Sequence, residues 1–478
     1  MKISKVSSLR GELRIPGDKS ISHRSVMLGA IAEGDTAVSG FLKSADCLAT
    51  IDCFRKLGIS IEEITDGSLY MNGACGNGPL IVIHGKGLRG LKAPKESLNA
   101  MNSGTTVRLL SGILAGQNFT SRIEGDRSLS KRPMKRIIRP LEVMGCNIAS
   151  EDKNNCLPLI IRGGSLKGIR YKSPVASAQV KSCILLAGLY ADAPTFFTEP
   201  SLSRNHTELM LSTFGGNLKT RKKEKEPEHF SVIPKPPKQA GASDDSNEYT
   251  TIIYPGTILR GQRITVPGDI SSAAYFIAAG LITPNSEITL RNVGINETRD
   301  GILRVARSMG ANIHPFNVRM EGREPVADLI IRSSHLTGTQ IGGALIPTLI
   351  DELPVIAVMA ACAEGKTEIR DASELRVKES DRLASIITCL TLLGIRVEET
   401  QSGMIIEGRG KKAGSAADAS GRNAVFHGSV IDPQGDHRIA MAFSIAGLVS
   451  DTPVVIKDTD CVRISYPDFY KDLKSLEG

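Results

Sequence analysis

The sequence predicts an α/β protein made of repeated units with two helices and several strands, arranged as two pseudo-symmetric halves around a cleft. Two recurring patterns along the chain predict the repeats. A third observation predicts the halves, because the segment IPGD at 15–18 returns as VPGD at 266–269 and is again followed by serines. Three repeats lie before this echo and nearly three after it, so the chain divides near its middle.

The first recurring unit is a helix of small and apolar residues that closes in Ala or Gly and leads through a polar turn into an apolar strand. It occurs at 25–38, 107–123, 180–196, 273–288, 354–369 and 439–455. The second unit is an amphipathic helix that ends in an apolar residue and Gly, then passes into a strand. It occurs at 55–59, 143–148, 213–218, 308–313 and 392–397, and a last helix is expected at 467–476. The Gly after each helix is the C-cap expected for a tight turn into a strand.

One segment, 219–247, interrupts this pattern of repeats. It is rich in Lys, Glu, Pro, Ser and Asp and carries PKPPK at its middle. Such a composition cannot bury enough apolar surface to form a core of its own. We therefore expect an exposed hairpin insertion that contributes no catalytic residue.

Composition narrows the class of protein and its partners. The net charge is +8, but the one dense basic run, 219–225, is mixed with glutamate, whereas nucleic-acid binders interleave basic residues with aromatics. No apolar run reaches the roughly 18–20 residues of a membrane span, and the N-terminus lacks the apolar core of a signal peptide. Nine scattered cysteines without a C-x-x-C pair indicate free thiols in a reducing cytoplasm, and eight histidines do not cluster with them as metal ligands. We expect a cytoplasmic protein that binds small anions rather than nucleic acid, membranes or metal.

The segment from Leu13 to Arg24 is the most informative motif. A short apolar strand ends in Pro-Gly, and a helix then begins with Lys19, Ser20 and Arg24 in its first two turns. Free N–H groups and the positive end of the helix dipole favour an anion at such a place, and the side chains add charge and a hydroxyl. A capped surface helix with two basic residues is the competing interpretation.

Similar polar groups begin several other predicted helices. They occur in NSGTTVR at 102–108, SLSKRP at 128–133, ASAQVKS at 176–182 and RNHTE at 204–208. Gly104 would let the backbone approach a ligand closely, and Ser177 fits either a cap or a ligand contact. A plain glycine turn and a solvated arginine are alternatives for the first two motifs. His206 has no base or metal partner in the sequence, so we expect a structural role for it.

Charged groups are densest between residues 350 and 382. Asp351 and Glu352 precede a very apolar helix, where desolvation is expected to raise a carboxyl pKa for general-base work; simple capping is the alternative. RVKESDR at 376–382 and DHR at 436–438 precede two further helices. Converging helix N-termini would make one anion-attracting cleft, in which Arg132, Arg382 and Arg438 could clamp carboxylate and phosphate groups.

The sequence does not indicate a nucleotide-binding site. GKGLRG at 85–90 matches the G-x-G-x-x-G pattern, but Pro94 follows and no helix begins there, so a dinucleotide site is not expected. The sequence also has no G-x-x-x-x-G-K-[ST] motif, which argues against nucleotide hydrolysis.

Taken together, these motifs resemble those of the 5-enolpyruvylshikimate-3-phosphate synthase family of enolpyruvyl transferases. PGDKSISHR, NSGTT-x-R, SLSKRPM, ASAQVKS, IDELP, ELRVKESDR and DHRIAM occur in the family's order and cover the whole chain except the 219–247 segment. The resemblance implies an inside-out α/β barrel architecture with three β-α-β-α-β-β units in each of two domains. It places one domain at 1–20 with 266–478 and the other at 21–265, with the active site in the cleft between them.

The resemblance also implies a reaction without metal or organic cofactor. Phosphoenolpyruvate would donate its enolpyruvyl group to the 5-hydroxyl of shikimate 3-phosphate, with Asp351 as base, Glu379 as acid and Lys19 between both substrates, although the two carboxylates could exchange or share duties. The residues implied for shikimate 3-phosphate are Lys19, Ser20, Arg24, Ser177, Ala178, Gln179, Arg204, Asp351 and Lys378. Those implied for phosphoenolpyruvate are Lys19, Gly104, Arg132, Gln179, Arg382 and Arg438. We expect a monomer.

The sequence departs from the better-known branch of the family at Ile464, where that branch has a lysine that contacts phosphoenolpyruvate. SLSKRPM and NSGTT resemble a second branch, some of whose members tolerate glyphosate. Gly104 lacks a methyl group that would crowd this inhibitor, so we expect moderate sensitivity at most.

Two alternatives remain at this point. One is the sister family of transferases that act on UDP-N-acetylglucosamine. That family is marked by a Lys-Asn pair at the opening loop and a reactive cysteine in a mobile loop, whereas this chain has Lys19-Ser20. A non-catalytic phosphate- or RNA-binding module would leave Asp351 and Glu379 without a purpose.

Overall fold

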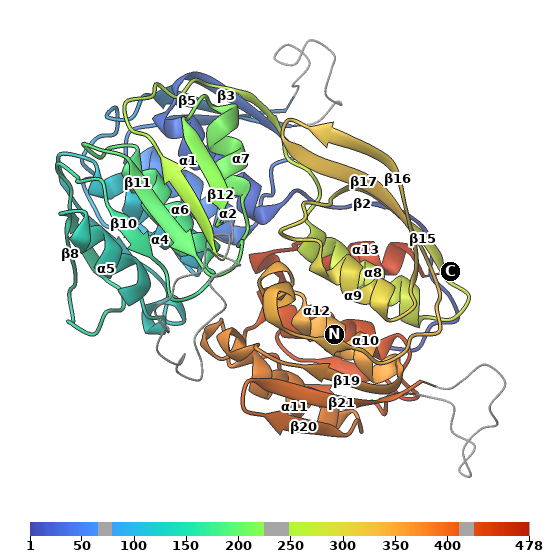
Figure 1. Cartoon of the computed structure of the whole chain (residues 1–478). Helices are drawn as coiled ribbons and strands as arrows, with labels where there is room; N and C mark the ends of the chain where they lie inside the picture. Colours follow the sequence, from blue (N-terminus) through green and yellow to red (C-terminus); the bar gives the residue numbers. More distant parts are fainter. Residues whose placement is uncertain (66–78, 224–247, 411–424, 478) are drawn as a thin grey trace, which may run out of the picture.

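The computed structural model describes residues 1–65, 79–223, 248–410 and 425–477. Figure 1 shows two lobes: the first carries the helices from α1 to α7, and the second carries those from α8 to α13. Of the predicted insertion at 219–247, only residues 219–223 belong to the described part of the chain.

The first lobe is built from twelve short strands and six helices among the described residues. Its strands are β3 (Glu33–Ser39), β4 (Ser60–Ile64), β5 (Leu80–Lys86), β6 (Leu98–Asn99), β7 (Thr120–Glu124), β8 (Asn147–Ser150), β9 (Leu159–Arg162), β10 (Arg170–Lys172), β11 (Thr195–Glu199), β12 (Leu218–Lys222), β13 (Tyr249–Ile253) and β14 (Arg263–Thr265). Its helices are α1 (Lys19–Ile31), α2 (Ala45–Lys56), α4 (Gly104–Ala115), α5 (Lys135–Val143), α6 (Ala178–Gly188) and α7 (His206–Thr213).

The second lobe combines the N-terminal strands with the C-terminal half of the chain. Its strands are β1 (Lys2–Ile3), β2 (Arg10–Arg14), β15 (Glu287–Gly294), β16 (Asn312–Glu321), β17 (Glu324–Arg332), β18 (Gln340–Ile341), β19 (Glu364–Ile369), β20 (Val397–Thr400), β21 (Gly403–Arg409), β22 (Val430–Ile431) and β23 (Val454–Ile456). Its helices are α8 (Ile270–Ile282), α9 (Gly301–Ser308), α10 (Leu353–Cys362), α11 (Arg382–Leu392), α12 (His437–Gly447) and α13 (Phe469–Ser475).

The sheets repeat one topology, and this confirms the predicted α/β repeat fold. In β6-β7-β9-β8, a parallel pair is joined through α4, α5 follows, and the last two strands pair antiparallel. The same strand pairing recurs in β10-β11-β13-β12, β14-β3-β5-β4, β16-β17-β15-β2 and β18-β19-β21-β20. In β14-β3-β5-β4 and β16-β17-β15-β2 the two strands of the parallel pair are not consecutive in the chain, because β2 leads through α1 to β3 and β14 leads through α8 to β15. The sixth sheet, β1-β23-β22, has three strands, and the N-terminal β1 completes it. This long-range pairing was not predicted.

The helices of the first recurring unit lie inside each lobe, which explains their small and apolar composition. In the second lobe α8, α10 and α12 pack against one another, and in the first lobe α1 and α6 both pack against α4. Helices enclosed on all sides have no polar face. At Gly112 a Cβ atom would lie 2.2 Å from the carbonyl oxygen of Cys183, so glycine there allows α4 and α6 to approach closely.

The buried apolar residues form two large clusters. One contains residues between Ile21 and Val266, and the other combines residues from Ile3 to Ile15 with residues from Ile270 to Leu476. The division of the chain into domains at 20 and 266 stays a prediction.

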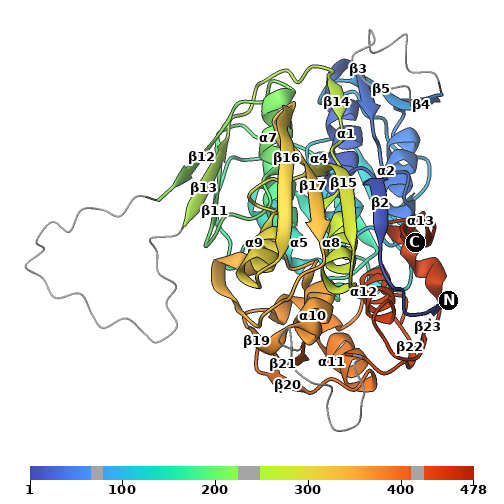
Figure 2. The ribbon, with the colours of Figure 1, turned by 90° about the vertical axis from the view of Figure 1, so that its right-hand side faces the viewer.

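The chain passes between the lobes twice, at the two PGD segments. As Figure 2 shows, β2 lies beside β15 in the second lobe, whereas β14 pairs with β3 in the first. The two segments exchange backbone hydrogen bonds, because Asp18 N donates to Pro267 O at 2.7 Å and Asp269 N donates to Pro16 O at 2.9 Å. The echo seen in the sequence is therefore a pair of adjacent crossings with local two-fold character, and both crossings open directly onto a helix start.

Candidate active site

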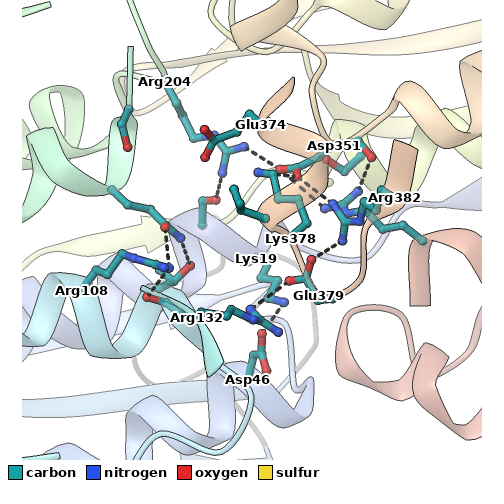
Figure 3. A pocket seen from close by; sticks show the side chains of 18 of the residues that line it. Lys19, Asp46, Arg108, Arg132, Arg204, Asp351, Glu374, Lys378, Glu379 and Arg382 are labelled. Carbon is teal, nitrogen blue, oxygen red and sulfur yellow. Dashed lines mark hydrogen bonds and ion pairs between the residues drawn. The ribbon is translucent and has the colours of Figure 1, made fainter. Parts of the chain in front are cut away.

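A cavity of about 190 Å³ lies between the lobes, next to the two crossings. Figure 3 shows side chains from both lobes pointing into it. The predicted site residues that line it are Lys19, Ser20, Gly104, Arg132, Ser177, Gln179, Arg204, Asp351, Lys378, Glu379, Arg382 and Arg438. Of the remaining two, Ala178 lines an adjoining cavity, and Arg24 lines neither. The structure thus brings together residues that are more than 400 positions apart in the sequence.

Helix N-termini surround the cavity as the sequence predicted. Asp18 caps α1 by accepting from Ile21 N, and Ser103 caps α4 by accepting from Thr106 N. In the second lobe, Asp381 caps α11 and Asp436 caps α12. The partial positive charge of each helix start adds to the full charges of the nearby Lys and Arg side chains, so the cavity attracts anions.

On the first-lobe side, α4 and α6 present a hydrogen-bonded group of side chains. Arg108 Nη1 donates to Gln179 Oε1 at 2.9 Å, and Gln179 Nε2 donates to Thr105 Oγ1 at 3.1 Å. Burial and, to a smaller extent, the neighbouring Arg132 together lower the pKa of Arg108 to about 10. The amide of Gln179 is therefore held in a fixed orientation at the cavity wall.

On the second-lobe side, Asp351 lies among four cations. Arg204 and Arg382 each approach its carboxylate to 3.3 Å, Lys378 to 3.5 Å and Arg438 to 3.8 Å. Burial opposes ionisation, but these cations overcome it and hold the pKa of Asp351 well below its ordinary value. The expectation that desolvation raises this carboxyl pKa was therefore wrong, because the four cations come from parts of the sequence far from Asp351.

Glu379 is the second carboxylate and joins the two lobes. Arg132 of the first lobe lies 3.2 Å from it, and Arg382 pairs with its other oxygen. Burial again opposes ionisation, but Arg382, Arg132 and the nearby Lys378 hold the pKa of Glu379 well below its usual range. Arg382 itself is buried and also donates from Nε to Asp436 at 2.8 Å.

Lys19 and Arg24 take different positions, although both lie near the start of α1. Lys19 Nζ points into the cavity and pairs with Asp46 of α2. Arg24 is buried behind the cavity wall, where its guanidinium donates to Ser20 O, Ser182 Oγ and Thr207 Oγ1 at 3.0, 2.9 and 2.6 Å. The structure does not bring Arg24 into the cavity, because contacts with α6 and α7 turn it inward.

Several polar or charged lining residues were absent from the predicted set. They are Asp46, Thr105, Arg108, Arg136, Asp269, Ser271, Arg299, Glu374 and His437. Arg108 and His437 lie inside motifs that the sequence analysis had already singled out, so motif membership was the available signal. Asp46 and Arg299 carry no local signal, since only tertiary contacts bring them to the site.

The structure also shows where His206 and Ile464 lie. His206 is buried, and its Nδ1 lies 2.7 Å from Glu324 of the other lobe, so it contributes to the contact between the lobes. Ile464 lines a second cavity, which adjoins the first at Arg132 and Glu379.

Two further features concern the class of protein. In the described ranges, no group of three or more His, Cys, Asp or Glu side chains is arranged to hold a metal ion. Among the helices in these ranges, none is long and apolar enough to span a membrane.

Comparison with known structures first identifies the fold. The enolpyruvyl transferase NikO from Streptomyces tendae superposes with a TM-score of 0.71 at 16% identity, covering 99% of this chain and 96% of the other. The fold is therefore that of an enolpyruvyl transferase.

Comparison of sequences identifies the family to which the chain belongs. Residues 3–243 and 238–473 match EPSP synthase (3-phosphoshikimate 1-carboxyvinyltransferase), so the chain belongs to this family. The 3-phosphoshikimate 1-carboxyvinyltransferases of Pelobacter propionicus and Bacillus subtilis are 48% and 46% identical, covering 99% and 100% of this chain and 98% and 99% of theirs. The EPSP synthase structure from Acinetobacter baumannii has a TM-score of 0.80 and 43% identity, covering 100% of this chain and 98% of the other.

Proposed function

We propose that this chain is a 3-phosphoshikimate 1-carboxyvinyltransferase. It transfers the enolpyruvyl group of phosphoenolpyruvate to the 5-hydroxyl of shikimate 3-phosphate and releases phosphate, as a step of aromatic amino acid biosynthesis. The observation that carries this proposal is the pair of carboxylates, Asp351 and Glu379, held among cations from both lobes in one cavity. Such a site binds two anionic substrates and keeps two proton-transfer groups beside them.

The state of Asp351 suits the addition step. Because its pKa lies well below the ordinary value, the carboxylate is ionised at neutral pH and can accept the proton of the 5-hydroxyl. That oxygen forms a bond to C2 of phosphoenolpyruvate while C3 takes a proton. The product of this step is a tetrahedral intermediate.

Glu379 gains its acid role when the anionic substrate arrives. Arg132 and Arg382 hold its pKa low, and a bound phosphate or carboxylate would neutralise both guanidinium groups. The pKa of Glu379 then rises, so the carboxyl can hold a proton and deliver it to C3. In the elimination step the proton returns from C3 to Glu379, the C2–O bond to phosphate breaks, and the C2–C3 double bond re-forms. The departing phosphate takes up the proton that Asp351 accepted, which restores the Asp351 carboxylate.

Each substrate is proposed to contact residues of both lobes. On the family motifs, shikimate 3-phosphate is held by Lys19, Ser20, Arg24, Ser177, Ala178, Gln179, Arg204, Asp351 and Lys378. Phosphoenolpyruvate is held by Lys19, Gly104, Arg132, Gln179, Arg382 and Arg438. The buried position of Arg24 favours an indirect contribution from this residue, through Ser20.

The oligomeric state, the localisation, the absence of a cofactor and the domain boundaries are proposed on the same basis. We infer a monomer that acts in the cytoplasm on small molecules, without metal or organic cofactor, and whose domains are 1–20 with 266–478 and 21–265. Motion between these domains would exclude water from the cleft and limit hydrolysis of the enol ether.

Phosphate release tests the assignment directly. The wild-type protein is mixed with phosphoenolpyruvate and either shikimate 3-phosphate or UDP-N-acetylglucosamine. Release with shikimate 3-phosphate alone is the expected result. Release with the nucleotide sugar alone would assign the sister reaction, and salt-dependent RNA binding without turnover would assign a binding module.

A further inference from the structure

Arg299 lies at the junction of the two chain crossings, on the connection between β15 and α9. Its side chain is 4% exposed. Nη2 donates to Ser271 Oγ at 2.6 Å and lies 3.5 Å from Asp269 Oδ1 and 3.6 Å from Glu352 Oε1. Nη1 lies 3.7 Å from Asp18 Oδ2. One guanidinium group therefore faces three carboxylates that come from three separate parts of the chain.

Each of these carboxylates belongs to the N-cap residue of a helix that leads to or borders the cavity. Asp18 caps α1, Asp269 caps α8, and Glu352 is the N-cap residue of α10. Two of them adjoin proposed catalytic groups in the chain, because Lys19 follows Asp18 and Asp351 precedes Glu352. Asp269 Oδ2 also accepts from the backbone N–H of Lys19 at 3.4 Å.

Electrostatics explains why an arginine is needed at this junction. Burial raises the pKa of Asp269, and the neighbouring Asp18 raises it further, so carboxylates gathered here repel one another. Among the groups facing this cluster, Arg299, Arg438 and Arg204 act against the repulsion. Arg299 differs from the other two because its fork reaches all three caps, a geometry that a lysine ammonium cannot reproduce.

We propose that Arg299 is a positioning residue for the transfer reaction: it holds the caps of α1, α8 and α10 together and so fixes Lys19 relative to Asp351. This inference rests on the proposed function. The polar contacts of its two terminal nitrogens go to Ser271 and to the three N-cap carboxylates, and this set of partners supports a positioning role.

Three variants test the role of Arg299. Arg299→Met removes the charge, Arg299→Lys keeps it without the fork, and Arg291→Met is the matched control. Arg291 is on β15, which leads into the connection that carries Arg299, and it pairs with Glu12 and Asp328 at 2.6 and 2.9 Å, but it lines none of the cavities described above. The measurements are kcat, KM for both substrates, and Tm.

The proposal predicts that kcat falls far more than KM rises. Misplacement of catalytic groups by about 1 Å costs about 100-fold, and we expect a loss of that size in Arg299→Met. Arg299→Lys should keep a Tm close to that of the wild type and still lose about tenfold in kcat. Arg291→Met should lower Tm and leave kcat unchanged.

Wild-type kcat in a folded Arg299→Lys would overturn the proposal, since charge alone would then suffice. The same holds if Arg299→Met and Arg291→Met lower kcat in proportion to their loss of Tm. Should Arg299→Met fail to fold, Arg299→Lys decides the question. Absence of turnover in the wild-type protein would instead contradict the proposed function, so the two failures can be told apart.

Discussion

Glu379 lies between the guanidinium groups of Arg132 and Arg382, one from each lobe. The stabilisation of its ionised state therefore weakens when another anion binds to these guanidinium groups. The same two arginines are proposed to hold phosphoenolpyruvate. Substrate binding and the protonation of Glu379 are thus coupled through shared cations.

Replacing Glu379 with glutamine tests this coupling. Glutamine keeps the size of the side chain but cannot deliver a proton, so we expect kcat to fall by about 10²–10⁴-fold, the usual range for a general acid. Glu399→Gln is the control, because Glu399 is exposed and pairs with Arg376 on the surface. A Glu379→Gln variant that retains wild-type kcat would remove this residue from the mechanism.

His437 has a measurable signature in the pH dependence of stability. Burial lowers its pKa to about 3, against about 6.5 in an unfolded chain. Between these values the unfolded chain binds a proton that the folded protein does not, so stability falls as the pH drops below about 6.5.

We expect His437→Gln to remove this part of the pH dependence. By pH 5 the wild type should have lost about 2 kcal/mol more than the variant, relative to pH 7.5. Urea unfolding at both pH values measures the difference. Equal losses in the two proteins would show that His437 titrates normally in the folded state.

At the scale of secondary-structure elements, the start of α4 shows how a glycine shapes the cavity. A Cβ atom on Gly104 would lie 2.6 Å from Arg108 Nη1 and 3.7 Å from Arg132 Nη1. The close atom is the mobile end of a side chain, so a methyl group would displace the guanidinium rather than unfold the helix. This displacement would break the hydrogen bond from Arg108 to Gln179.

Gly104→Ala should therefore weaken phosphoenolpyruvate binding more than turnover. We expect KM for phosphoenolpyruvate to rise about tenfold, equivalent to about 1.4 kcal/mol, with a smaller change in kcat. Gly164→Ala is the control, because no atom lies within 4 Å of the added Cβ there. An unchanged KM in Gly104→Ala would mean that Arg108 and Gln179 do not shape this subsite.

At the scale of the whole molecule, ion pairs join the two lobes across the cleft. Besides Arg132–Glu379 and Arg204–Asp351, Arg136 Nη1 lies 2.9 and 3.0 Å from the two carboxylate oxygens of Glu374. The last pair is half-exposed at the rim of the cavity, and Figure 3 shows Glu374 on the side of the cleft opposite α4. Arg136 and Glu374 are therefore suited to favour closure without taking part in proton transfer.

Charge exchange between Arg136 and Glu374 tests this role. Exposed pairs contribute about 0.2–1 kcal/mol, so either Arg136→Glu or Glu374→Arg alone should raise KM for both substrates about two- to fivefold. The double variant restores the attraction and should return KM to near the wild-type value. If the effects of the two substitutions simply combine, so that KM in the double variant is higher than in either single variant, a role in closure is contradicted.

Much of the fold could be predicted because its signals are local. Residues 180–196 were expected to form a helix, turn and strand, and α6 and β11 lie there. The pairing of β1 with β23 could not be predicted, because it joins two segments at opposite ends of the sequence and no local pattern indicates their contact.

Part of the candidate site could also be predicted from local patterns, whereas the features that depend on tertiary contacts could not. Motifs at helix starts identified most of the lining residues, because helix N-termini attract anions wherever the helices lie. The inward turn of Arg24 and the lowered pKa of Asp351 depend on partners far along the chain. Arg299 belongs to no motif, so its role emerges only from the crossing of the two segments.

In the proposed reaction, this cleft moves an enolpyruvyl group intact from one substrate to the other. Carbon-13 NMR of phosphoenolpyruvate labelled at C2, incubated with the protein and shikimate 3-phosphate, follows that carbon directly. We expect the C2 signal of phosphoenolpyruvate to be replaced by one enol-ether signal, with one phosphate released per product. Conversion of the label to pyruvate alone, or an enol ether formed only with UDP-N-acetylglucosamine, would contradict the account.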